Sequence, residues 1–290
     1  MFSIGITAIL LSVLFYVIYY STVKEFSKDT NYRVTAIVVV GISIVPMIAA
    51  AAFFGMPYSG MLWLPLSVAA GVFLFLGFEL LYIALHTQHL TSAVGVGEIQ
   101  TVILALFGIF VFGETVRTAS IIGMVVVFTG IALMLAGKRA KMNRKLLPFL
   151  ASSVCLSAFW IVTSYSMQSA SGFLAPLIVS RAVALAFTAV AFFLAPGAIG
   201  NKTKASERGI RRKALVVILL GAAAGIADGI GDSLFSFAVS HGYLAVGAVL
   251  TMLIPVAVAT IAYFAYRERL MSIELAGFVL ILAGALIMLA

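Results

Sequence analysis

Long apolar runs, separated only by short polar stretches, constrain this chain more than any other feature of its sequence. Ten such runs are predicted to be helices, and they cover roughly residues 3–21, 34–54, 61–85, 90–112, 119–137, 147–168, 173–195, 214–240, 243–265 and 270–290. A helix of about 20 apolar residues crosses the hydrocarbon core of a bilayer, and it satisfies its backbone hydrogen bonds without water. We therefore predict an all-α polytopic membrane protein with ten transmembrane helices.

The polar residues are too few to cover a soluble domain. Of the 290 residues, 63% are hydrophobic and 10% are charged, whereas soluble domains carry about 25% charged residues. The longest polar stretches, 200–213 and 137–145, are too short to form a separate domain. The single Cys155 lies in an apolar run, so neither a disulfide framework nor a thiolate metal site is expected, and no cofactor is predicted.

The basic residues indicate an orientation in the membrane. The net charge of +8 would suggest a nucleic-acid partner in a soluble protein, but here the charges flank apolar spans, so no nucleic acid is expected. Sixteen of the 18 Lys and Arg residues fall on one side of the predicted membrane, including the loops 138–145 and 202–213. By the positive-inside rule this side is cytoplasmic. Both termini are then predicted outside, in an integral protein of the cell membrane.

Two stretches of the sequence resemble each other, 113–136 and 267–290. A shift of 154 positions superposes their distinctive residues, which are Glu114 with Glu268, Gly123 with Gly277 and Gly130 with Gly284. Earlier in the chain the offset drifts, and Arg33 is matched with Arg181 at 148. The chain therefore divides into halves 1–140 and 141–290 with five helices each, and the odd number predicts that the second half is inverted relative to the first. Transporters with inverted repeats bind their solute between the halves.

These features resemble the drug/metabolite transporter superfamily, and in particular its EamA-type members. The resemblance covers nearly the whole chain and rests on the five-plus-five layout, the Gly113-Glu114 pair before a glycine-spaced helix, the proline at 255 and the SAFW stretch at 157–160. Two features depart from the family: Thr101 stands where the second half has Pro255, and many members keep their termini in the cytoplasm. The resemblance implies a transporter of amino acids or related metabolites, or of drug-like cations as a second choice.

Glu98 is the first candidate for chemistry, because it lies near the middle of the predicted span 90–112. A carboxylate at that depth is costly and usually faces a cavity, where it handles substrate or protons. The alternative is a protonated side chain that bonds to a neighbouring helix. Some family members resemble this one in carrying a glutamate in the fourth helix.

Asp228 and Asp232 are four residues apart and share one face of the span 214–240. They are predicted either to bind a cation or relay protons, or to tie helices together through Arg181 in the span 173–195. For Arg181 a structural ion pair competes with capture of an anionic group of the substrate. Glycines around the two acids, at 221, 225, 229 and 231, would let a backbone or a ligand approach closely.

The remaining candidates are a third acid and a group of aromatic residues. Glu79 lies nearer a membrane end, where a solvated or structural role competes with a role in coupling. Trp160, Tyr82 and Tyr165 are predicted either to line a pocket or to pack within the bundle. Glu114 and Glu268 are each expected to face the positive end of the helix that follows them, without a role in transport.

Taken as a set, these residues favour a secondary transporter that moves a small organic solute outward by alternating access. The chain has no GxxxxGK[ST] motif, so the proton gradient or the solute gradient is the expected source of energy. The expected partners are a small-molecule solute, the lipid bilayer and protons, and the sequence carries no clear signal for an oligomer. An organic-cation exporter and an intramembrane lipid-modifying enzyme are the alternatives, although no Ser-His or HExxH pattern supports the enzyme.

Overall fold

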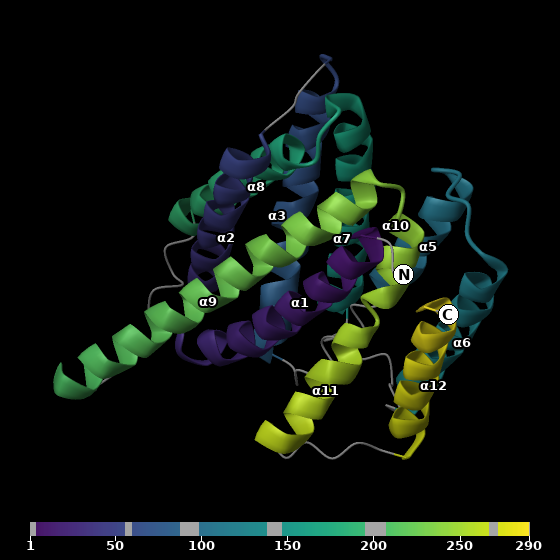
Figure 1. Cartoon of the computed structure of the whole chain (residues 1–290). Coiled ribbons are helices and arrows are strands. Elements are labelled where there is room, and N and C mark those ends of the chain that lie inside the picture. The colour runs from purple at the N-terminus through teal and green to yellow at the C-terminus, as the bar shows by residue number, and fades with distance from the viewer. Residues whose placement is uncertain are drawn as a thin grey trace.

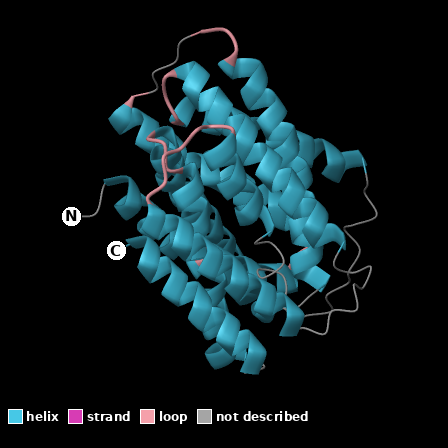
Figure 2. Cartoon of the chain, turned by 90° about the vertical axis from the view of Figure 1, so that its right-hand side faces the viewer, coloured by secondary structure: helices cyan, strands magenta, loops and turns pink. Residues whose placement is uncertain are grey.

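The chain consists of helices joined by short loops. The structure is a computed structural model, and it describes residues 4–55, 60–87, 99–137, 147–194, 207–266 and 272–289, with no strand within these ranges (Figure 2). The helices are α1 (Ile4–Asp29), α2 (Tyr32–Phe54), α3 (Trp63–Thr87), α5 (Ile99–Phe110), α6 (Thr118–Gly137), α7 (Leu147–Ala170), α8 (Leu174–Leu194), α9 (Glu207–Ser240), α10 (Leu244–Leu250), α11 (Leu253–Tyr266) and α12 (Ser272–Leu289). The predicted all-α fold is confirmed.

The helices account for the ten predicted spans. Seven segments are long and apolar enough to cross a membrane: α1, α2, α3, α7, α8, α9, and α10 taken together with α11. The shorter apolar helices α5, α6 and α12 lie at the other three predicted spans. Large apolar side chains point away from the protein, and Phe53, Phe193 and Phe264 are each more than three-quarters exposed. Such a surface suits contact with lipid rather than with water.

The ninth predicted span is broken into α10 and α11 at Thr251 and Met252. Pro255 lies in the first turn of α11, where the missing N–H group of a proline leaves no helical hydrogen bond unmade. At the offset of 154, Thr101 of α5 stands where α11 has Pro255 (101 + 154 = 255).

Helices of one half pack mainly against helices of the other half. The helix α3 lies along α7, and its counterpart α9 lies along α1; α2 packs against α9, and α8 packs against α3. The counterparts α6 and α12 pack against each other, as Figure 1 shows in teal and yellow. If each helix is replaced by its counterpart in the other half, every one of these packed pairs becomes another observed pair or the same pair. This symmetry of contacts is expected of two related repeats.

The recurring glycines show that the two repeats are inverted. A Cβ atom at Gly123 of α6 would overlap the carbonyl oxygen of Gly284 of α12, and one at Gly130 would overlap the carbonyl oxygen of Gly277. Residue numbers thus rise along α6 where they fall along α12, so the two helices are antiparallel. Because α6 and α12 are counterparts, the halves run in opposite directions. The glycines recur at one offset because both copies meet at this close seam.

Both ends of the described chain lie on the same side of the bundle. Ile6 of α1 and Leu289 of α12 pack around one buried cluster, which includes Ile9 and Ala285. An even number of membrane crossings requires this arrangement. It agrees with the ten predicted spans.

Close contacts also correct the alignment of α2 with α8. Gly71 and Gly225 are counterparts at the offset of 154. A Cβ atom at Gly71 would meet the carbonyl oxygen of Ser180, and one at Gly225 would meet the carbonyl oxygen of Val39. Ser180 therefore corresponds to Val39, and the offset between α2 and α8 is 141 (180 − 39 = 141).

The predicted equivalence of Arg33 and Arg181 is consequently wrong. At the offset of 141, Arg181 corresponds to Val40. The error of seven residues is about two helical turns. It arose because the two arginines were matched by residue type, whereas the packing of the glycines fixes the register.

Candidate functional site

A central cavity of about 100 Å³ lies between the two halves. Its walls come from α1, α3, α5, α7, α8, α9 and the break between α10 and α11. The residues that line it include Tyr16, Leu74, Phe78, Phe159, Trp160, Arg181, Asp228, Asp232 and Phe235. Small-molecule sites usually measure roughly 300–1,000 Å³, so the cavity is smaller than a typical site of this kind.

Three charged side chains form an ion triad in one wall of the cavity. The Nη1 of Arg181 on α8 donates to Asp228 Oδ2 at 2.5 Å, and its Nη2 donates to Asp232 Oδ2 on the same helix α9. The three residues are 1%, 2% and 3% exposed. With both carboxylates ionised the triad would carry a net charge of −1 (+1 − 2), which a proton on one of them or a bound positive group would balance.

Further contacts hold the ion triad in place. The Tyr16 hydroxyl of α1 donates to Asp232 Oδ1 at 2.7 Å. The Nη1 of Arg181 also donates to Ser43 Oγ at 3.3 Å, and the guanidinium carbon lies 5.0 Å from the centre of the Phe78 ring. A cation within about 6 Å of an aromatic face is attracted by the ring. The triad therefore joins α8 and α9 of the second half to α1, α2 and α3 of the first.

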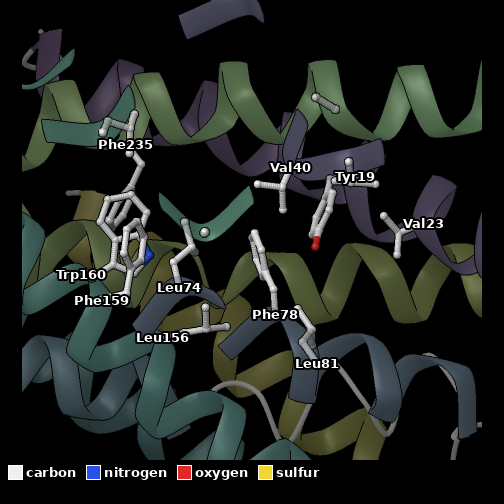
Figure 3. Close-up of a cluster of buried hydrophobic side chains, with 14 of the residues drawn as sticks. Tyr19, Val23, Val40, Leu74, Phe78, Leu81, Leu156, Phe159, Trp160 and Phe235 are labelled. Carbon is white, nitrogen blue, oxygen red and sulfur yellow. The ribbon is translucent and has the colours of Figure 1, made fainter. Parts of the chain in front are cut away.

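The wall contributed by the first half is apolar at the corresponding positions. Asp228 and Asp232 correspond to Leu74 and Phe78 at the offset of 154, and Arg181 corresponds to Val40 at 141. The three apolar counterparts belong to the buried hydrophobic cluster shown in Figure 3, and Leu74 and Phe78 line the cavity directly. The charged residues of the cavity therefore come from the second half, and the residues at the corresponding positions of the first half are apolar.

A second hollow of about 650 Å³, here called the vestibule, lies at the end of α2, α7 and α9. Ser164 and Val239 line it, one helical turn beyond Trp160 and Phe235 on α7 and α9. Those two rings meet edge to face with their centres 4.7 Å apart and are 6% and 3% exposed. The Trp160–Phe235 pair thus lies between the cavity and the vestibule, and Figure 3 shows it at one end of the apolar cluster.

The structure places several predicted residues in the cavity wall. Arg181, Asp228, Asp232 and Trp160 line the cavity together, and the predicted contact between Arg181 and the two acids is present. Their role in transport stays a prediction. Glu98 lies outside the described residues.

The other predicted residues lie away from the cavity. Glu79 pairs with Arg33, with Nε of the arginine 2.9 Å from Oε1, at the opposite end of α3 from the vestibule. The Tyr82 hydroxyl lies 3.2 Å from that of Tyr19 and is fully buried behind the cavity wall. Tyr165 is 40% exposed. Tyr82 and Tyr165 are not among the residues that line the cavity, so of the two predicted alternatives the structure favours packing within the bundle.

Tyr165 and the glycines of α9 show what their faces contact instead. The Tyr165 ring packs against Phe112 with ring centres 4.8 Å apart. Gly225 and Gly229 of α9 lie against the backbone of α2, since a Cβ at either position would meet a carbonyl oxygen there. These two glycines serve helix packing rather than the approach of a ligand.

Glu114 binds a helix terminus, but not that of the helix that follows it. Its Oε1 accepts from the backbone N–H of Leu244 at 2.6 Å, and its Oε2 accepts from that of Ala245 at 2.7 Å. Burial raises the pKa of Glu114, while these two hydrogen bonds lower it, and the net shift is upward. The prediction that it faces the dipole of α6 is wrong: it ties the segment after α5 to α10 of the other half.

Phe78 and Tyr16 are among the cavity residues that the sequence analysis did not single out. Phe78 could have been found, because it corresponds to Asp232 at the offset of 154 (78 + 154 = 232). Tyr16 carries no such signal, since it is one of several tyrosines in α1 and contacts a residue 216 positions away. Tertiary packing alone selects it.

Comparisons with known proteins agree with the repeat architecture. The model of the EamA-like transporter family matches the chain twice, over residues 3–136 and 143–290. A solved crystal structure of another protein is similar in fold, with a TM-score of 0.71 over 97% of this chain and 97% of that chain, at 17% sequence identity. No curated protein matches the sequence.

Proposed function

Because the chain belongs to the EamA-like transporter family, we propose that it carries a small organic solute across the membrane by alternating access, with the solute bound beside the ion triad. The observation that supports this most is the position of the triad. Buried charges in a membrane usually mark a solute or ion pathway, and inverted repeats bind their solute between the halves. Here three charges line a hollow between the halves.

The proposed solute is an amino acid or a related metabolite, and the proposed direction is outward. The path runs from the cavity past Trp160 and Phe235 into the vestibule. The vestibule lies on the side where α1 begins, since Gly5 of α1 contacts the ring of Tyr243 in the loop between α9 and α10. The positive-inside rule assigns that side to the exterior and the basic loops 138–145 and 202–213 to the cytoplasm.

Proton coupling is proposed from the charge of the triad. Two carboxylates face one guanidinium, so a proton or a positive group of the solute would balance the site. Competition between the two for the same carboxylate would exchange one proton for one solute molecule. The same charge also suits an organic cation, which is the second candidate solute.

Counterflow in proteoliposomes tests the proposal. The purified chain is reconstituted, loaded with candidate solutes and assayed for exchange of labelled solute, with and without a pH gradient across the membrane. We expect exchange of amino acids that accelerates when the gradient is imposed. Lipid turnover without movement of any solute would instead indicate the enzyme, and the absence of exchange for all solute classes would refute transport.

Glu98 is tested in the same assay. In the Glu98→Gln protein we expect exchange to lose its dependence on the pH gradient, because the amide cannot titrate. Unchanged exchange with unchanged pH dependence would remove Glu98 from the mechanism. Cysteine labelling in the loop 200–213 from either side of intact cells checks the orientation independently.

A further inference from the structure

We infer that Arg181 binds the carboxylate of the transported solute, that Asp228 binds its ammonium group, and that the solute is a zwitterion with an apolar side chain. This inference rests on the proposed function, because it assigns the groups of the solute to the walls of the same cavity. It also separates the two candidate solutes, since an organic cation lacks the carboxylate.

Arg181 has hydrogen-bond donors that the described segments of the chain leave unused. A guanidinium offers five N–H donors, and the recorded contacts use Nη1 twice and Nη2 once, leaving two (5 − 3 = 2). One of these is the Nε–H group, which has no acceptor among the described residues although the side chain is 1% exposed and lines the cavity. A buried donor without an acceptor is costly, so the site lacks an acceptor at this place.

The missing acceptor is best supplied by a carboxylate. Its geometry matches the planar fork of a guanidinium, and charge assistance makes such hydrogen bonds stronger than neutral ones. An anion alone would make the net charge of the occupied site more negative, from −1 to −2 (−1 − 1 = −2). A solute that brings a carboxylate must therefore bring a positive group as well.

Asp228 is the partner for that positive group. Asp232 accepts hydrogen bonds from both Arg181 and Tyr16, whereas the only hydrogen bond recorded for the Asp228 carboxylate within the described part of the chain comes from Arg181. Each carboxylate has about four lone-pair positions. Asp228 lines the cavity beside Arg181, so its remaining acceptor capacity is available to a positive group bound there.

Apolar residues that line the cavity account for the side chain of the solute. They include Leu74 and Phe78 of the first half and Phe159 and Trp160 of the second, and all four belong to the apolar cluster of Figure 3. Burial of apolar groups against such residues is favourable. A solute with charged groups at one end and an apolar side chain matches both the charged and the apolar residues of the cavity.

Binding to the native cavity provides the first test. The protein has two tryptophans, so Trp63→Phe leaves Trp160 in the cavity wall as the only source of tryptophan fluorescence. Titrations use L-alanine, L-valine, L-leucine, L-methionine and L-phenylalanine, then the methyl ester and the deaminated acid of each responding amino acid, and tetraphenylphosphonium as the organic cation. We expect at least one amino acid to bind and its two derivatives to bind at least about tenfold more weakly, as the loss of a charge-assisted hydrogen bond predicts.

A conservative variant provides the second test. Arg181→Lys keeps the positive charge but removes the Nε–H donor, and it is expected to lower the affinity for the responding amino acid at least about tenfold. Arg33→Lys is the matched control in the ion pair outside the cavity, and its affinity should not change. A purely structural Arg181 would give equal affinities in all three proteins. If Arg181→Lys does not fold, the ester and acid titrations of the native arginine still decide.

The outcomes separate this inference from the proposed function. Equal binding of an amino acid and its methyl ester, or binding of tetraphenylphosphonium with no response to any amino acid, overturns the inference. Counterflow of tetraphenylphosphonium in proteoliposomes would then leave the transporter standing. Counterflow of neither class would overturn the proposed function itself.

Discussion

Removal of Arg181 should destabilise the protein far more than removal of either of its acidic partners. Arg181→Gln leaves Asp228 and Asp232 facing each other as two unpaired charges, at 2% and 3% exposure. Asp228→Asn instead leaves one arginine paired with one aspartate, and the net charge of the triad changes from −1 to zero. The first change creates buried charge, whereas the second removes it.

The expected magnitudes differ enough to be measured. Breaking a buried ion pair by removing one partner costs about 3–5 kcal/mol, and each kcal/mol shifts the Tm of a domain of 150–250 residues by roughly 2–4 °C. Arg181→Gln should therefore lower the Tm by roughly 6–20 °C. Asp228→Asn keeps an acceptor oxygen and so turns one charge-assisted hydrogen bond, worth about 1.5–3 kcal/mol, into a neutral one worth about 0.5–1.5 kcal/mol, and its cost should be about 1–1.5 kcal/mol.

Thermal unfolding of the detergent-solubilised protein, followed by circular dichroism or by size-exclusion chromatography after heating, measures both variants under the same conditions. Arg33→Gln serves as the control, because its ion pair with Glu79 is partly exposed at 18% and 15% and should matter less. The reasoning fails if Arg181→Gln and Asp228→Asn give equal Tm values.

Three further predictions follow from the packing around the site. Gly123→Leu should cost about 1–3 kcal/mol by forcing α6 away from α12, and it should lower the folded yield in detergent. The lipid-facing Val125→Leu should leave that yield unchanged, and equal yields of the two variants would contradict the close packing of α6 against α12. Burial raises the pKa of Glu114, so protonation of Glu114 stabilises the folded state at low pH, and this contribution is lost as the pH rises through the raised pKa. Glu114→Gln should therefore flatten the dependence of Tm on pH, and an unchanged slope would contradict this role of Glu114. In a cysteine-free protein that carries Ser153→Cys, Trp160→Ala should let an impermeant thiol reagent enter from the vestibule and label the new cysteine. Equal labelling rates with and without Trp160 would show that this side chain does not separate the vestibule from the cavity.

The sequence predicted those features that the bilayer imposes on every chain. The spans were placed by the length of their apolar runs, and the inversion followed from the odd number of helices in each half. The contact of Arg181 with Asp228 and Asp232 was among the predicted alternatives because intramembrane charges require partners. These predictions depend on short-range pattern and composition, which a single sequence displays directly.

The features that the sequence missed depend on contacts between distant segments. Tyr16 reaches Asp232 across 216 positions, and Glu114 reaches Leu244 across 130. No local spacing marks either contact. The register of α2 against α8 was likewise misassigned, because the shared arginines suggested an offset that the packing of Gly71 and Gly225 does not permit.

The ion triad has no charged counterpart in the first half, and this asymmetry bears on the relative populations of the two access states that alternating access requires. In a pair of inverted repeats, exchanging the conformations of the halves converts one access state into the other. Two identical repeats would therefore give the two states equal energy, and the population of each state must be set by residues at which the repeats differ. The largest such difference at the cavity is the replacement of Val40, Leu74 and Phe78 by the ion triad. A solute that pairs its charged groups with those of the triad would then bind the two states with different affinity, and a ligand shifts an equilibrium only through such a difference. The charges on one side of the pseudo-symmetric site would in this way link recognition of the solute to the change of access.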